Sequence, residues 1–420
     1  MDSRDKFDQS NSPFPLVVSY IADFRDDPMH EKARKRTKVT AVGFAVVAAF
    51  GIGLLQEARS ADAPSPWPLQ LEMRVPFEPT AFSSVGRNYL SYELYLTNFS
   101  SSPLTLRRVE VLDANDSVGA PIAAFEASQL DSLVQPIGAQ TSADGISDPQ
   151  QLAGGATVVV FLWIALDHGA HVPNKLRHRI LTADSAAEGA VIGTHHTELK
   201  VLGPPVTGTN WLADDGPSND QDNHHRRGIL VFQGREQISR RYAIDWQQSQ
   251  NGKTFSGDAS DKRSYYAYGK PVLAVADGTV VTSRDGLPDN VPRHNGQFTP
   301  AVAMTPDTVF GNNIVLDLGG QQFATYCHLQ PGSMRVKVGD HVRRGQVLAK
   351  IGDSGDAREP HVHFQVQTSS NPLAGEGVPY LIDHYRVKSA GDVWTTSTHE
   401  LPLRNMVVNF GGVRGASSDR

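Results

Sequence analysis

Residues 358–366, REPHVHFQV, place two histidines on either side of a single valine. The valines and Phe364 favour an extended strand, in which successive side chains point to opposite faces. His361 and His363 therefore share a face. Two imidazoles on one face, just after a polar loop, can supply a metal ligand and a neighbouring acid/base group. The alternative is a pair of surface histidines, and the rest of the chain decides between the two interpretations.

The composition limits what the protein can be. A chain of 420 residues with 39% apolar residues has room for two or three domains with substantial cores. The formal net charge of −6 gives no reason to expect nucleic-acid binding. The single cysteine, Cys327, excludes an internal disulfide. We expect a buried thiol there, turned by strand alternation to the face opposite His328.

The N-terminal region has the order of a signal peptide or a membrane anchor. A basic cluster at 30–36 precedes an apolar run at 39–55, and small residues follow. We expect residues 1–63 to be a leader, with translation starting at Met29. The basic flank keeps the start of the leader in the cytoplasm, so the rest of the chain is expected to be exported. It would lie in the periplasm or cell envelope, or be secreted if the leader is cleaved. The alternative interpretation of the apolar run is a buried core helix.

The next part of the chain carries short strand patterns. Two alternating segments lie within 89–114, and a continuous apolar run occupies 154–166. Strands at this spacing predict an immunoglobulin-like β-sandwich over 64–203. The following stretch, 204–223, is rich in Pro, Gly, Asn and Asp, and predicts a linker.

A second β domain is expected over 224–390. Its sequence repeats a pattern of strand, tight glycine turn and strand, with almost no helical periodicity. This predicts an antiparallel sheet, so that the fold class of the whole chain is all-β. Residues 391–420 are expected to form a C-terminal tail.

Four stretches of the second domain form an ordered set: YAIDW with Asp245, VLAVADGTVV, FATYCHL with His328, and REPHVHF. Together they resemble the M23 family of zinc metallopeptidases, the lysostaphin and LytM-type peptidoglycan endopeptidases. The resemblance covers roughly residues 224–370. It implies that Asp245 and His363 bind Zn²⁺, that His361 is the general base, and that His328 orients the water or stabilises the oxyanion. Such a site keeps an open zinc position that activates water, and an imidazole beside it moves the proton.

The chain departs from the family pattern at one position. The family has a histidine ligand four residues before the aspartate, where this sequence has Arg241. A guanidinium stays protonated and offers no lone pair, so Arg241 cannot bind zinc. Either the site is inactive, or another side chain supplies the missing ligand.

A hairpin offers a replacement. If 224–232 and 237–246 are strands whose first pair is Phe232 and Gln237, His224 lies directly opposite Asp245 and can reach the same metal. A register slip of one residue brings in His225 instead. We therefore predict His224 as the third ligand, with His225 as the alternative. Two solvated histidines after a polar linker are the competing interpretation.

The sequence thus predicts an exported zinc-dependent metalloendopeptidase that hydrolyses peptide bonds of peptidoglycan. The sandwich domain would position the catalytic domain or bind an envelope protein partner, and membrane contact is expected only through an uncleaved leader. The alternative is a catalytically inactive M23-like scaffold or activator of the cell envelope. Retention of Asp245, His328, His361 and His363 favours the enzyme.

Overall fold

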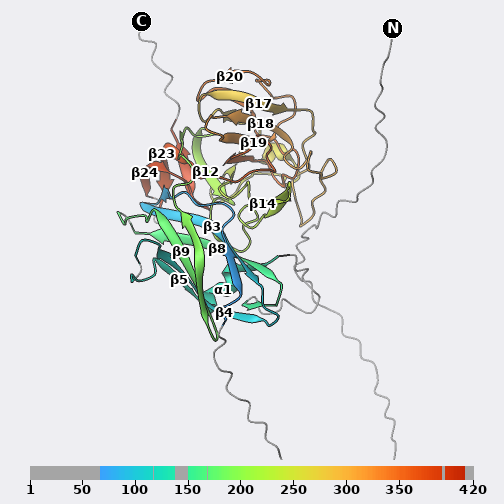
Figure 1. Ribbon diagram of the computed structural model, residues 1–420. Coiled ribbons are helices and arrows are strands. Elements are labelled where there is room, and N and C mark those ends of the chain that lie inside the picture. The colour runs from blue at the N-terminus through green and yellow to red at the C-terminus, as the bar shows by residue number, and fades with distance from the viewer. Residues whose placement is uncertain (1–66, 117, 138–149, 168, 390–392, 412–420) are drawn as a thin grey trace, which may run out of the picture. The chain divides into compact units, whose positions relative to one another are not determined.

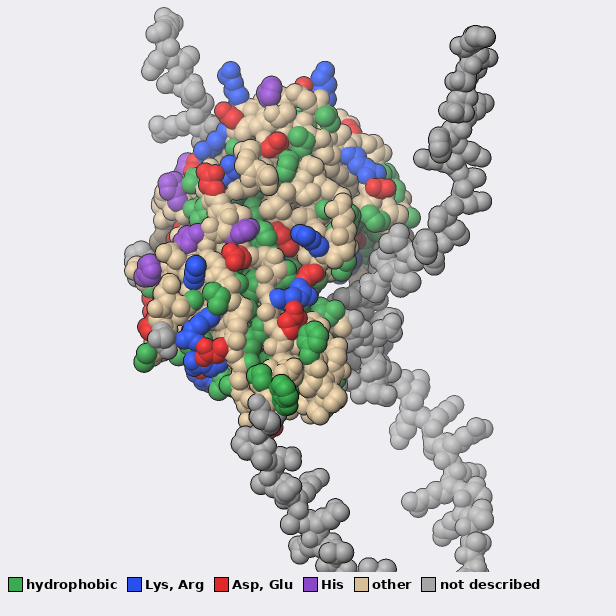
Figure 2. Space-filling model, viewed as in Figure 1, with side chains coloured by type: hydrophobic (Ala, Val, Ile, Leu, Met, Phe, Trp, Pro, Cys, Tyr) green, Lys and Arg blue, Asp and Glu red, His purple; other side chains and the backbone are tan. Residues whose placement is uncertain are grey.

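The computed structural model describes residues 67–411, except for 117, 138–149, 168 and 390–392. The predicted leader, 1–63, lies outside the described residues. Within the described part of the chain, no helix is long and apolar enough to cross a membrane. Acidic and basic side chains lie interspersed on the face of the molecule seen in Figure 2.

Two five-stranded sheets form the first part of the described chain (Figure 1). The first has the order β1-β3-β8-β6, with β2 paired to β3: β1 Leu71–Arg74, β2 Phe82–Ser84, β3 Arg87–Asn98, β6 Val134–Pro136 and β8 Thr157–Leu166. The second has the order β10-β9-β4-β5, with β7 paired to β4: β4 Leu104–Asp113, β5 Ala123–Glu126, β7 Gln151–Leu152, β9 Lys175–Thr182 and β10 Ala186–Gly193. A short helix, α1 (Ala127–Leu133), joins β5 to β6.

The two sheets share one hydrophobic core. It contains Leu90, Leu94 and Val160 from the first sheet and Val109 and Ile180 from the second. The immunoglobulin-like topology of this pair of sheets stays a prediction.

Strands β3 and β8 are buried on both faces. In β3, residues of even number such as Tyr92 enter the sandwich core, whereas Tyr89 and Tyr95 pack with residues of the second part of the chain, Tyr242 and Ile238. Burial on both faces explains the continuous apolar run of β8, because a strand with no solvated face has no need to alternate. The sandwich sheet is therefore directly docked on the domain that follows it.

An eleven-stranded sheet forms the second part, in the order β11-β23-β25-β12-β15-β22-β19-β18-β17-β20, with β24 paired to β23. Its pairs are antiparallel except β11 with β23. The strands are β11 Val201–Leu202, β12 Gly208–Asp214, β15 Ile244–Gln248, β17 Gly278–Arg284, β18 Asn312–Asp317, β19 Phe323–Leu329, β20 His341–Val342, β22 Val362–Gln367, β23 Leu381–Lys388, β24 Trp394–Glu400 and β25 Val407–Phe410.

Two small two-stranded sheets accompany it, β13 (Leu230–Phe232) with β14 (Arg235–Gln237), and β16 (Pro271–Leu273) with β21 (Val347–Lys350). A single 3₁₀ turn, η1, covers Lys262–Ser264. Strands dominate both parts of the described chain, so the predicted all-β fold class is confirmed.

The structure corrects two predicted boundaries. The stretch 204–223 is not a plain linker, because β12 within it pairs with both β15 and β25. Trp211 and Ala213 of β12 alternate into the core, a pattern that the polar residues on either side conceal. The segment 391–420 is not simply a tail, since it contributes β24 and β25 to the same sheet.

Candidate functional site

Sheet register brings two of the predicted ligands together. Asp245 in β15 pairs with His363 in β22, and His363 pairs on its other side with Cys327 in β19. Directly opposed residues share a face. Their neighbours Ile244 and Phe364 enter the hydrophobic core, so Asp245 and His363 point away from it. His363 Nδ1 lies 2.9 Å from Asp245 Oδ1.

His361 reaches the same carboxylate from the start of β22. Its Nε2 lies 3.5 Å from Asp245 Oδ1, and its Nδ1 is 2.7 Å from the backbone oxygen of Glu359. Because Nδ1–H donates to that carbonyl, Nε2 is the nitrogen that faces Asp245. The predicted common face of His361 and His363 thus corresponds to a common target, Asp245.

His328 joins this group through an irregular backbone. Its φ is +61°, a left-handed conformation that costs a non-glycine residue about 1–3 kcal/mol. The departure from strand geometry ends the alternation after Cys327, so the expectation that Cys327 and His328 face apart is wrong: Cys327 is registered opposite His363, and the His328 ring centroid lies 4.8 Å from that of His361. His328 Nδ1 donates to the oxygen of Ser354 at 2.7 Å. Cys327 is buried, as predicted.

The hairpin that was to supply the third ligand has a different register. Strands β13 and β14 are three residues each and pair Phe232 with Arg235, so the predicted Phe232–Gln237 pair is wrong and His224 is not opposite Asp245. The direct partners of Asp245 are His363 and Asp214. A hairpin this short ends well before the histidine pair, which lies instead in a turn between β12 and β13.

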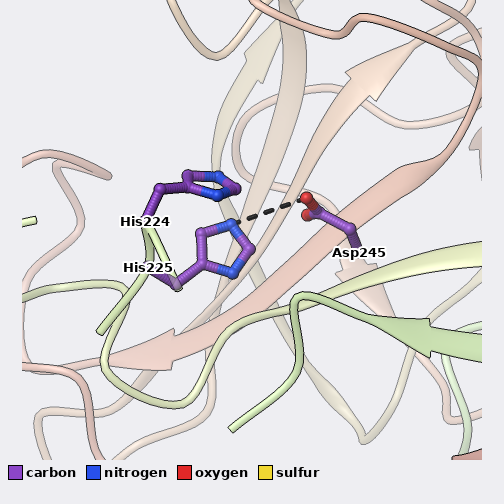
Figure 3. Close-up of side chains that lie close together, drawn as sticks. All are labelled: His224, His225 and Asp245. Carbon is purple, nitrogen blue, oxygen red and sulfur yellow. Dashed lines mark ion pairs between the residues drawn. The ribbon is translucent and has the colours of Figure 1, made fainter. Parts of the chain in front are cut away.

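That turn nevertheless delivers His225 to the site (Figure 3). His225 is 2% exposed, and its Nε2 lies 3.6 Å from Asp245 Oδ2. Its Nδ1 donates to the oxygen of Asp215 at 2.9 Å, which leaves Nε2 directed at the carboxylate. His224 is adjacent but exposed, and its Nδ1 pairs with Asp215 Oδ2 at 2.8 Å. One ligand atom from each of His224, His225 and Asp245 lies within 4.8 Å of the others.

The donor set fits a zinc ion. Gln365 Nε2 donates to the oxygen of Pro372 at 3.3 Å, which directs Gln365 Oε1 to His363 Nε2 at 2.7 Å. His363 Nε2–H then donates to Gln365, so its Nδ1 lone pair meets the carboxylate of Asp245. Two groups that both offer lone pairs need a shared cation or an extra proton between them. His225 Nε2 faces the same carboxylate, and this His₂Asp set is one that zinc favours.

The electrostatics of the site are dominated by burial and by one carboxylate. Burial lowers the pKa of His225 and of His328 well below the usual value. Burial also opposes protonation of His361, but the charge of Asp245 raises its pKa to about 9. Asp245 is itself buried, yet the surrounding imidazoles hold its pKa well below the ordinary range. Burial and nearby carboxylates raise the pKa of Asp214 to about 6.

Arg241 lies away from this group. Its side chain is buried and its Nη2 lies 2.7 Å from both Glu93 and Glu376, while Nη1 donates to the oxygen of Gly377 at 2.9 Å. Arg241 therefore contributes to the contact with β3 and lies apart from the histidines around Asp245.

Replacing Arg241 with histidine is expected to lower the stability of the protein. Arg241→His leaves the buried carboxylate of Glu93 short of a partner, which costs about 3–5 kcal/mol of unfolding free energy. Zinc affinity is not expected to rise. Urea unfolding and zinc titration test this, with the exposed Arg235→His as the matched control. A stable variant that binds zinc more tightly would contradict it.

Asp353 is a second unusual carboxyl. It is fully buried, and within the described residues neither of its side-chain oxygens has a hydrogen-bond partner. Burial, against the opposing charge of His361, raises its pKa to about 8. Because the folded-state pKa exceeds the unfolded one, the folded state binds the proton more tightly, and stability falls as pH rises from about 4 to 8.

Asp353→Asn is expected to remove this pH dependence. The amide cannot ionise, so the variant should be more stable than the wild type by on the order of 4 kcal/mol near pH 7, and equal to it near pH 4. Urea unfolding of both proteins at several pH values measures the difference. An equal difference at all pH values would show that folding does not shift the pKa of Asp353.

Part of the chain is similar to known peptidases. Residues 264–374 match the model of Peptidase family M23. That range contains His328, His361 and His363, whereas His225 and Asp245 lie before it in the chain. Lysostaphin of Staphylococcus simulans is 36% identical over 89 residues, 20% of this chain and 18% of that protein. Glycyl-glycine endopeptidase ALE-1 of Staphylococcus capitis is 32% identical over 126 residues, 29% of this chain and 27% of that protein.

The chain thus matches only a small part of the length of these relatives. Among solved structures, the catalytic domain of lysostaphin from Staphylococcus simulans has 21% identity and a TM-score of 0.22, over 40% of this chain and 88% of that one. A zinc containing peptidase from Vibrio cholerae has 16% identity and a TM-score of 0.21, over 74% of this chain and 86% of that one.

Proposed function

Because residues 264–374 form a domain of Peptidase family M23, we propose that this protein is an exported zinc-dependent metalloendopeptidase that hydrolyses peptide bonds of peptidoglycan. The observation that carries the proposal is the convergence on Asp245 of imidazole nitrogens from His225, His361 and His363. For His225 and His361, Nδ1 is held by a backbone carbonyl, so the nitrogen left over faces the carboxylate.

In this proposal Asp245, His363 and His225 hold the zinc. His225 takes the place predicted first for His224, because it is buried with Nε2 towards Asp245 whereas His224 is exposed. Zinc bound there would polarise the scissile carbonyl and lower the pKa of water towards about 7, so that water could give up a proton and attack near neutral pH.

The two remaining histidines handle protons. His361 and His328 each anchor Nδ1–H on a backbone carbonyl, which fixes the ring and leaves Nε2 to accept a proton and return it. His361 lies beside Asp245 and is assigned the general base, because a zinc ion on Asp245 would offset the carboxylate charge that raises the pKa of His361. His328, whose ring packs against His361, orients the attacking water or the developing oxyanion.

A catalytically inactive envelope scaffold is the second candidate. It is favoured by the 2.9 Å approach of His363 Nδ1 to Asp245, since a protonated His363 would satisfy that carboxylate without any metal. The loss of the family's histidine at Arg241 points the same way.

Metal analysis with a peptidoglycan assay separates the two. The purified full chain is expected to hold about one zinc per molecule and to lower the turbidity of a peptidoglycan suspension. A chelator should stop the hydrolysis, and one equivalent of zinc should restore it. A protein that sediments with peptidoglycan but takes up no zinc and releases no peptide would support the scaffold and contradict the enzyme.

A further inference from the structure

We propose that the sandwich domain positions the third zinc ligand, and that Glu93 of β3 is the positioning residue. The inference rests on the proposed function, because it concerns the zinc ligand His225. It gives the sandwich a definite role within the metal site, beyond that of a neighbouring domain.

Glu93 is an unusual residue for its place. It lies in the middle of β3, is 4% exposed, and is surrounded along the strand by the buried Tyr92 and Leu94. An ionised carboxylate in such a place is costly unless cations satisfy it. Two arginines of the second domain do so, Arg226 and Arg241.

Arg226 directly follows His225 in the chain. It is fully buried, forms an ion pair with Glu93, and its Nη2 donates to the oxygen of Tyr92 at 2.9 Å. Its guanidinium lies 4.8 Å from the ring centroid of Phe161 in β8. The residue next to the ligand is therefore held by β3 and β8 of the sandwich.

Arg241 connects the same carboxylate to the other side of the metal site. It precedes Asp245 by four residues, and its Nε and Nη2 donate to Glu93 at 3.1 and 2.7 Å. One carboxylate thus ties down both chain segments whose ends carry His225 and Asp245. A shift of Glu93 would therefore change the distance between His225 and Asp245. That distance determines whether the two side chains can bind the same ion.

The turn that carries His225 has further anchors on the sandwich and on itself. Asn219 Nδ2 donates to the oxygen of Phe161 at 3.0 Å, and Asn223 Oδ1 accepts from the backbone N–H of Arg226 at 2.9 Å. Arg241 and the turn that carries His225 are therefore both anchored on the sandwich.

Two variants of the full chain test the inference. Glu93→Gln removes the shared charge. Arg226→Met releases the segment beside His225 and leaves Glu93 paired with Arg241, and thermal unfolding measures what the loss of one partner costs in stability. Glu236→Gln is the matched control, since Glu236 forms a different sandwich-to-catalytic ion pair, with Arg74 of β1. Zinc affinity is measured by chelator competition, thermal unfolding is followed in parallel, and the visible spectrum of the Co²⁺-substituted protein reports the ligand set.

Glu93→Gln and Arg226→Met are expected to weaken zinc binding about 10–100-fold, the range found for residues that orient metal ligands, and to alter the Co²⁺ spectrum. Glu236→Gln should change neither. Wild-type zinc affinity in both test variants would overturn the inference, as would an equal loss in the control, which would show a general docking effect. A wild type that binds no zinc would overturn the proposed function itself and this inference with it.

Discussion

Replacing His225 with alanine is expected to weaken zinc binding at least 100-fold and to abolish peptidoglycan hydrolysis, whereas His224→Ala should change either by no more than a few-fold. The two histidines are adjacent but differ in environment: His225 is buried with Nε2 3.6 Å from Asp245, and His224 is exposed and paired with Asp215. Loss of a direct ligand costs more than the 10–100-fold that loss of an orienting contact costs. Zinc content after dialysis and turbidity clearance measure the two effects.

His224→Ala serves as the control for His225→Ala. Both remove one imidazole from the same turn, so a general disturbance of that turn would lower zinc binding in both. Circular dichroism of the zinc-free proteins checks that each variant is folded. Zinc loss in His224→Ala alone would restore the first sequence prediction, and unchanged zinc in both would mean that the third ligand comes from elsewhere.

The parts of the site that depend on strand alternation could be predicted from the sequence. Period-two alternation places His361 and His363 together, and the same rule extends to Gln365, which orients His363 and which the sequence analysis missed. The signal for it was present in HVHFQ, two residues beyond the second histidine. Asp245 was found by its resemblance to a family motif, and register in the sheet then sets it beside His363.

The parts that depend on tertiary contacts could not be predicted. His225 was named only as the alternative ligand, through a register slip; it reaches Asp245 from a turn docked on the sandwich, and no local pattern encodes that contact. A register that sets His224 opposite Asp245 needs long paired strands, but β13 and β14 pair over only three residues each. His328 turns towards the site through a positive φ, which is uncommon for any residue other than glycine, and the strand pattern FATYCHL contains no turn signal that marks it.

One clue to the domain contact was visible in the sequence. Glu93 interrupts the strand pattern YLSYELYL, where apolar residues occupy both faces. A strand apolar on both faces is buried on both, and a carboxylate in it requires a cation from whatever covers it. The sequence therefore contained evidence that a second layer with a buried arginine covers β3, although not which arginine.

Removing His361 or His328 is expected to separate catalysis from metal binding. Both are near Asp245, but in the proposed function they transfer protons and do not hold the ion. Loss of a general acid or base lowers turnover by about 10²–10⁴-fold. His361→Ala should therefore lower kcat by this amount at nearly full zinc content, and His328→Ala should lower it by at least tenfold. Peptide release from peptidoglycan and metal analysis of the same samples give the two numbers.

His225→Ala is the variant with which His361→Ala is compared. Loss of a zinc ligand and loss of a proton-transfer group both abolish activity, but only loss of the ligand lowers the amount of bound zinc. Excess zinc should partly restore His225→Ala and leave His361→Ala inactive. His384→Ala, which removes an exposed histidine from β23, controls for the loss of an imidazole as such. If His361→Ala lost zinc in proportion to activity, His361 would be a ligand, and the assignment of His225 as the third one would need revision.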